Sequence, residues 1–282
     1  MRVYVEGVGV CGPGLGGWAA SRPVLAGAER YVAAPAVVPP SALLPANERR
    51  RTVLTVKLAM AVGAEAFANA GRDPAETATV FTSSGGDGET LHGILSGLAS
   101  DEREISPTRF HNSVHNAPAG YWSIATRSHA PSSSLCAFDA SFGAGLLEAA
   151  SQATAEERAV GLIAYDLSYP EPLHSVRAVG ALFGLGLVLT PWPTQMSLAS
   201  IDVAPRRAAG NPSPMADEAL EALRRSTPAA RSLPLLAALA RREPASIVLD
   251  YLPDLELRLS LEPVAAGLLG IRDDRPPIAA RE

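Results

Sequence analysis

Apolar residues follow two spacings along the first two thirds of the chain. Four short runs are rich in apolar and β-branched residues, and they cover residues 2–10, 77–82, 159–165 and 181–189. Runs of this length predict strands, and the fourth, apolar almost throughout, predicts a strand covered on both faces. Helical spacing marks residues 50–70 instead, and Gly71 is placed to end that helix as a C-terminal cap. Strands that alternate with helices predict an α/β fold with a largely parallel sheet.

Loops and helices fill the intervals between these runs. Residues 12–45 are rich in proline and glycine and are expected to form a long connection. A glycine-rich loop at residues 83–88 leads into a helix expected over 89–99, and a further helix is expected over 111–126.

The centre of the chain predicts a sharp elbow. Residues 132–137 alternate like a strand, the chain turns at Phe138, Asp139 and Ala140, and a helix follows over 143–153. Such a turn holds one side chain beside the free N–H groups and the positive dipole end of a helix. Enzymes often hold a nucleophile at such a position, but an aspartate is favoured as a helix-capping carboxylate.

The remaining third has a different pattern. A polar link at residues 206–214 precedes two amphipathic helices, and two strands then form a hairpin around Pro253 and Asp254. The helices are expected over 215–225 and 232–242, the strands over 246–251 and 255–261. The last dozen residues are expected to be frayed.

Composition and charge exclude several functions. Of the 282 residues, 47% are hydrophobic, so the chain can bury a sizeable core. The net charge is −5, and basic residues are scattered apart from Arg49, Arg50 and Arg51, so a nucleic-acid role is disfavoured. The N-terminus lacks the apolar run of a signal peptide or membrane span, which favours the cytoplasm.

Cysteine and histidine positions predict neither a metal nor a cofactor. Cys11 and Cys136 make neither a disulfide framework nor a zinc set, and Cys136, in an alternating strand, is expected to be buried. His111 and His115 lie four apart on one predicted helix, the spacing of a metal pair. Asn112 follows His111 where a glutamate would be needed, and no third ligand is evident, so hydrogen-bonding or interface roles are favoured.

Two further motifs are weak. Residues 7–12 match the glycine fingerprint of dinucleotide sites, but no helix begins directly after them to hold a pyrophosphate. Ser83, His92 and Asp139 could form a catalytic triad on paper, yet no Gly-x-Ser-x-Gly elbow orders them.

The elbow and its surroundings resemble the β-ketoacyl synthases and their chain-length-factor partners. The resemblance begins at Ser106-Pro107, continues through Asn116-Ala117-Pro118-Ala119-Gly120 and reaches the stretch from Pro131 to Ser141 without a gap. These segments are similar to the family's Ser-Pro start, its Asn-x-x-x-Gly helix and the Pro-Ser-x-Ser strand before the active cysteine. In that register Asp139 occupies the cysteine position.

The resemblance implies a thiolase-like fold, layered α-β-α-β-α. A near-complete N-terminal half would span residues 1–195, and a reduced C-terminal half, residues 196–282, would join the same globular unit. The family's second half normally supplies two catalytic histidines, whereas no histidine follows His174 here, and a chain of the family is usually more than a hundred residues longer. A carboxylate cannot form the acyl thioester, so condensing activity is not expected.

The resemblance also implies a partner. Family members dimerise by pairing the strand before the active residue, here 132–137, across a two-fold axis. This chain is most similar to the short chain-length-factor-like subunits of bacterial aryl polyene systems. Such a subunit would pair with a cysteine-bearing β-ketoacyl synthase, receive acyl chains through the partner's acyl carrier protein, and help to shape the partner's acyl tunnel. Candidate interface and tunnel residues are Phe110, His111, His115, Tyr121, Trp122, Ser132, Ser134, Cys136, Phe138 and Phe142.

Two alternatives stay open. The chain could be an acyl-thioester hydrolase that uses Asp139 with His111 or His115, or it could be a stand-alone acyl-binding homodimer. For each aromatic candidate, packing in the core is as good an explanation as a tunnel.

Overall fold

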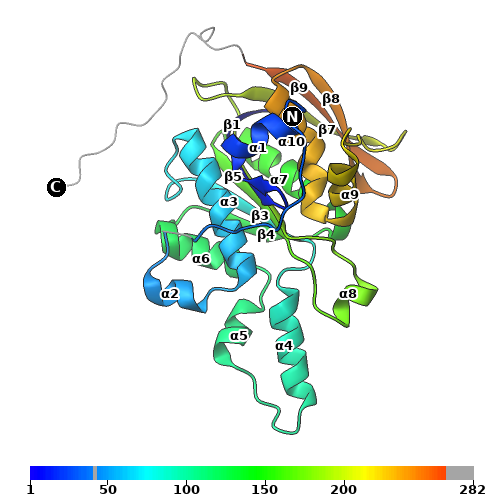
Figure 1. The fold of residues 1–282 in the computed structure, drawn as a ribbon. Helices are drawn as coiled ribbons and strands as arrows, with labels where there is room; N and C mark the ends of the chain where they lie inside the picture. Colours follow the sequence, from blue (N-terminus) through cyan, green and yellow to red (C-terminus); the bar gives the residue numbers. More distant parts are fainter. Residues whose placement is uncertain (41–42, 265–282) are drawn as a thin grey trace, which may run out of the picture.

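Nine strands form one mixed sheet, with the order β4-β3-β5-β6-β1-β7-β9-β8 and with β2 beside β1 (Figure 1). The computed structural model describes residues 1–40 and 43–264. The strands are β1 (Arg2–Gly12), β2 (Leu15–Gly16), β3 (Ala78–Thr82), β4 (Ser132–Leu135), β5 (Val160–Asp166), β6 (Phe183–Thr190), β7 (Ala199–Arg207), β8 (Ala245–Leu252) and β9 (Leu255–Pro263). The α-helices are α1 (Trp18–Leu25), α2 (Ala46–Arg51), α3 (Leu54–Ala70), α4 (Gly88–Ala99), α5 (Pro107–Asn112), α6 (Ala117–Thr126), α7 (Ser141–Ala155), α8 (Leu173–Val176), α9 (Glu218–Ser226) and α10 (Leu233–Arg241). Two 3₁₀ turns, η1 (Phe138–Ala140) and η2 (Pro228–Ser232), complete the set.

The prediction of a largely parallel sheet is wrong. Among the described strands, only β3 with β4 and β3 with β5 pair in parallel. The pairs β5 with β6, β6 with β1, and β1 with β7 are antiparallel, as are β7 with β9 and β9 with β8. A parallel pair needs a crossover connection, usually a full helix, whereas the segment between β5 and β6 holds only the four-residue α8.

Helices cover both faces of the first five strands in the sheet order. On one face, α3 and α6 form a core with Val62, Phe67 and Phe81. On the other face, α7 packs against β3 and β5 and also against β8. The second core, which includes Val8, Leu146 and Leu236, therefore lies between the first strands and the β7-β9-β8 part of the sheet.

The far side of β7, β9 and β8 faces solvent in the described part of the chain. Along β7, Ile201 and Val203 are buried while Ser200 and Asp202 are partly exposed, and along β9 Arg258 and Ser260 are exposed. This alternation is typical of a sheet with one wet face. No described helix covers it, so the layers observed are helix, sheet, helix, sheet.

The long helices are more broken than their spacing predicts. Thr52 and Val53 have extended backbone angles, so the segment expected as one helix over 50–70 begins instead as α2 and resumes as α3. Gly71 closes α3 with φ 63°, as predicted. Pro118 lies in the first turn of α6, where a missing N–H costs little, so the helix expected over 111–126 is divided into α5 and α6.

The connection expected over residues 12–45 contains α1, and the strand β7 was not predicted. Pro23 lies inside α1, and a proline in such a segment argues against a helix when only the sequence is considered.

Gly7 and Gly9 leave room for the backbone of α3, because a Cβ at either would collide with it. The fingerprint glycines thus serve close packing. The elbow, the terminal hairpin and the two amphipathic helices form at the expected places, and the expected fraying lies in residues outside the described ranges.

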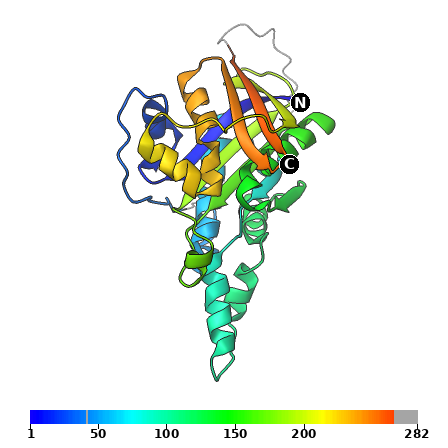
Figure 2. The ribbon, with the colours of Figure 1, turned by 90° about the vertical axis from the view of Figure 1, so that its right-hand side faces the viewer.

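The α4–α5 pair projects away from the body in both views (Figure 2). Across residues 1–40 and 43–264, no helix is long and apolar enough to cross a bilayer.

Candidate functional site

The elbow consists of β4, a short link, η1 and α7, as the sequence predicts. Phe138 adopts φ 52°, a left-handed conformation that is strained for a bulky residue, and its side chain is exposed. The turn is fastened by Ser141, whose hydroxyl accepts from the N–H of Ala137 (3.1 Å) and donates to the carbonyl of Phe138 (2.7 Å). The Ser141 side chain, rather than that of Asp139, therefore satisfies backbone groups of this turn.

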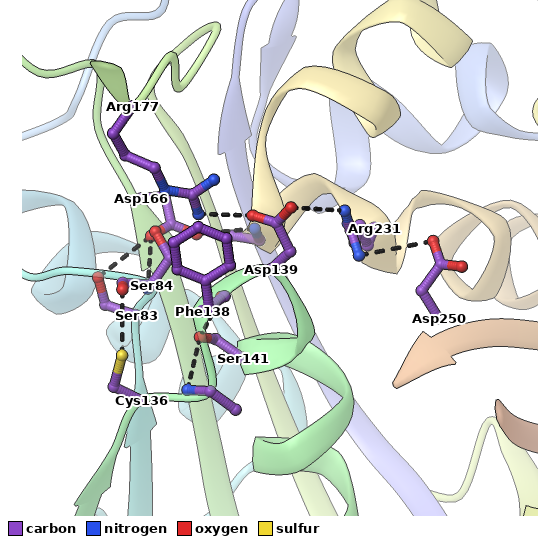
Figure 3. A network of polar contacts seen from close by, with 12 residues as sticks. Ser83, Ser84, Cys136, Phe138, Asp139, Ser141, Asp166, Arg177, Arg231 and Asp250 are labelled. Carbon is purple, nitrogen blue, oxygen red and sulfur yellow. Dashed lines mark hydrogen bonds and ion pairs between the residues drawn. The ribbon is translucent and has the colours of Figure 1, made fainter. Parts of the chain in front are cut away.

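Asp139 does not cap the helix, so that prediction is wrong. Neither η1 nor α7 has a capping bond from a side chain at its N-cap. Instead, Nη2 of Arg177 lies 2.5 Å from Oδ1 of Asp139, and Nη2 of Arg231 lies 3.1 Å from Oδ2 (Figure 3). Two guanidinium groups hold the carboxylate more strongly than helix N–H groups would, because both partners are charged.

The contacts of Asp139 extend into a network across the elbow. Nη1 of Arg231 lies 3.5 Å from Oδ2 of Asp250 on β8. The guanidinium of Arg177 lies 3.7 Å from the ring centroid of Phe138, a cation–π contact. Both oxygens of Asp139 thus engage arginines, and the network joins the elbow to β8 and η2.

A buried carboxylate lies behind the elbow, at the end of β5. Asp166 accepts bonds from the N–H of Ser84 (2.8 Å), the N–H of Ala229 (2.8 Å) and the hydroxyl of Ser83 (3.2 Å). Burial raises the pKa of Asp166, and these three donors oppose the rise. Asp166 therefore ties the glycine-rich loop to η2. Sequence reasoning missed it, although a charged residue ending a buried strand is a usable signal.

The outer edge of β4 is unpaired within the described chain, since β4 bonds only to β3. A groove of about 550 Å³ runs beside it between β4 and the start of α6. Its walls are small or polar and comprise His115, Asn116, Ala119, Gly120, Ser123, Ser132 and Ser134. An unpaired strand edge beside a groove is a template for another chain.

Three candidate residues line this groove, and two others are exposed without lining it. His115, Ser132 and Ser134 are groove residues, and Nε2 of His115 lies 3.2 Å from the carbonyl oxygen of Ser83. Cys136 follows β4 and is exposed, not buried as expected, with Sγ 3.0 Å from the carbonyl oxygen of Ser84. Phe110 on α5 is also exposed.

Three aromatic candidates belong to the interior. Tyr121 and Trp122 are buried beneath α3. The ring centroids of Trp122 and Phe67 are 5.3 Å apart. Phe142 is buried against the other face of the sheet. These three side chains pack the chain's own core and do not reach the groove.

The two histidine arrangements that the sequence disfavours are not assembled by the described residues. His111 ends on α5, with its ring 5.7 Å from that of Tyr121, while His115 lies in the turn after α5, so they share no helix face. The triad drawn from Ser83, His92 and Asp139 is not assembled either, because Ser83 bonds Asp166 and Asp139 bonds arginines. Among the described residues, no group of histidine, cysteine or acidic side chains could hold a metal ion.

This chain is similar in sequence to one protein family and similar in fold to several solved structures. A family model described as "Beta-ketoacyl synthase, N-terminal domain" matches residues 25–248. A comparison with curated proteins finds no match.

Several solved structures share the fold. One is the ketosynthase ApeO in complex with its chain length factor ApeC from Xenorhabdus doucetiae, with 22% identity, 92% of this chain and 99% of that chain covered, and a TM-score of 0.69. The ishigamide ketosynthase/chain length factor has 14% identity, 94% and 100% coverage and a TM-score of 0.67. AntDE:AntF, a type II acyl-carrier protein in complex with its ketosynthase, has 12% identity, 93% and 99% coverage and a TM-score of 0.73. These matches confirm the expected α/β fold.

Proposed function

Because this chain belongs to the β-ketoacyl synthase family, with the thiolase-like fold of that family, we propose that it is a non-catalytic, chain-length-factor-like subunit. It pairs with a cysteine-bearing β-ketoacyl synthase and works on acyl chains that an acyl carrier protein delivers to that partner. The observation that carries the proposal is the arginine-bound carboxylate of Asp139 at the position of the acylated cysteine.

The chemistry at the elbow supports an inert subunit. A carboxylate bound by Arg177 and Arg231 offers neither a thiolate for acyl transfer nor a free base for activating water. No histidine follows His174, so the later half offers no imidazole to stabilise an enolate. The hydrolase alternative needs a histidine on Asp139, and arginines hold that place.

The edge of β4 and its groove support pairing with another subunit. Small and polar walls, with Ser132 and Ser134 facing the groove, allow a second backbone to approach closely. A strand added to β4 would satisfy its free backbone groups and extend the sheet. The ApeO–ApeC and ishigamide structures are complexes of a ketosynthase with a chain length factor, and a similar complex is our proposal for this chain.

Fewer residues are candidates for shaping the partner's acyl tunnel than the sequence suggests. Phe110 and Phe138 are exposed and can contact a partner, whereas Tyr121, Trp122 and Phe142 are core residues. We propose an aryl polyene or related polyketide pathway as the setting. We also keep the division near residue 195 between a ketosynthase-like half and a reduced half.

Co-expression with the cysteine-bearing synthase encoded nearest to this chain tests the proposal. Native mass spectrometry should show a 1:1 complex, and acyl transfer from the carrier protein should label only the synthase. A chain that stays monomeric beside the synthase, or that forms only a homodimer, would contradict the proposal. Turnover of an acyl thioester by the isolated chain would favour the hydrolase alternative.

A further inference from the structure

The projecting α4–α5 pair, residues 88–112, carries an exposed apolar surface. Of the sixteen large hydrophobic side chains exposed in the described chain, five lie within this arm and a sixth, Val114, lies two residues after it. These six are Leu91, Leu95, Leu98, Ile105, Phe110 and Val114. A group of this size on a projection is unusual for a surface that faces only water.

The three leucines form a stripe along α4. Leu91, Leu95 and Leu98 are spaced by four and three residues, so they share one helix face. Two contacts pack α4 within the arm: Ile94 is buried beside the leucine stripe, and on the opposite face Gly93 leaves room for the guanidinium of Arg109. The leucine face is therefore surplus to the internal packing of the arm.

The base of the arm is fixed. Asp87 caps α4 by accepting from the N–H of Thr90 (2.7 Å), and the hydroxyl of Thr55 on α3 donates to the same carboxylate (2.5 Å). Tyr169 packs over Gly88, where a Cβ would collide with its ring. At the far end of α5, the side-chain amide of Asn112 donates to the carbonyl of Arg51 (3.0 Å). A fixed arm can present its apolar face without a large ordering cost.

The arm is continuous with the groove beside β4. Val114 is followed directly by His115 and Asn116, which line the groove. A Cβ at Gly86, just before the arm, would lie 3.7 Å from the ring of His115. A subunit seated on the β4 edge would therefore meet the arm next.

We propose that the α4–α5 arm is a second docking element, whose leucine stripe binds an apolar surface of the same synthase that occupies the β4 edge. The inference rests on the proposed function and adds a contact to it. The stripe engages the partner as an amphipathic helix engages a groove, with Leu91, Leu95 and Leu98 as anchors. The acidic tip, with Asp101, Glu102 and Glu104 around Arg103, stays in water.

The test compares the full chain with a Leu91→Ser, Leu95→Ser, Leu98→Ser variant in binding to the synthase by isothermal titration calorimetry. The variant should bind at least tenfold more weakly and keep the thermal unfolding midpoint of the parent. A matched control is Val32→Ser, Val37→Ser, Met196→Ser, which removes three exposed apolar side chains from outside the arm and the groove. Its affinity should equal that of the parent. Leu95→Ser alone serves if the triple variant fails to fold.

The outcomes separate the two proposals. Equal binding by the leucine variant would overturn the arm while leaving the synthase partnership intact. Failure of the unaltered chain to bind the synthase would instead remove the proposed function, and with it the occupant of the arm. Self-association that the leucine substitutions abolish would show that a second copy covers the stripe, which also overturns the inference.

Discussion

Arg231 reaches Asp139 across 92 positions of sequence, with Nη2 3.1 Å from Oδ2. The contact joins η2 to the elbow, and the same guanidinium continues to Asp250 on β8. Asp139, which the resemblance places at the reactive-cysteine position, thereby links two parts of the fold. We therefore expect Asp139 to stabilise the fold and to hold η2 against the elbow.

Asp139→Asn should lower the free energy of unfolding by about 1 kcal/mol, because it removes the charge that two partly buried arginines share. Urea unfolding of the isolated chain measures this. Asp202→Asn is the control, since the Asp202 pair with Arg2 is more exposed and should contribute less. An Asp139 variant as stable as the parent would show that the network is not a stabilising link.

Asp139→Cys should not restore condensing activity. A thiol at that position would have arginines and no histidine beside it, and no histidine follows His174 in the sequence. Mass spectrometry after incubation with an acyl-loaded carrier protein, together with an assay of condensation, gives the answer. Condensation by this variant would mean that a synthase site survives.

Ser134→Arg should reduce binding to the synthase by tenfold or more, because the new side chain would fill the groove beside β4. The fold should be unaffected, since this part of the groove is open. Ser246→Arg places the same charge on the exposed side of β8 and is the control. Equal affinity for both variants would exclude the β4 edge as the binding surface.

Glu221→Gln should flatten the acid limb of the stability profile. The hydrogen bond from Arg224 holds the pKa of Glu221 at about 2, below its ordinary value of 4.5. A depressed pKa contributes stability that is present above pH 4.5 and lost as the pH falls toward 2. The variant should therefore be less stable at neutral pH and lose less stability over that window. Glu218→Gln, on an exposed carboxylate of the same helix, should retain the parent's profile in denaturant melts at stepped pH.

The elbow could be predicted from the sequence because its signals are local. Alternation in β4, small residues in the turn and helical spacing in α7 all lie within a short stretch. The partners of Asp139 could not be predicted, since Arg177 is 38 positions away and Arg231 is 92 positions away. Asp139 was therefore expected to use the nearest helix N-terminus.

Aromatic roles were harder to predict for a related reason. Tyr121 and Trp122 lie on a helix that resembles an interface element, and spacing alone does not tell which face meets the chain's own α3. The spacing of His111 and His115 predicts one helix, but α5 ends at Asn112 and α6 begins at Ala117, with Pro118 in its first turn. Alternating strands and helices predict a parallel β6, but the connection after β5 holds no crossover helix and β6 is antiparallel.

The free edge of β4 has a consequence for the fate of unassembled protein. Residues 132–135 contain no charged side chain and no proline, the usual guards of an exposed strand, whereas β8 at the opposite end of the sheet carries Asp250. We expect chains made in excess of the proposed synthase partner to aggregate through this edge and to be degraded by cellular proteases. The cellular level of this chain would then follow that of the proposed synthase partner without a dedicated regulator.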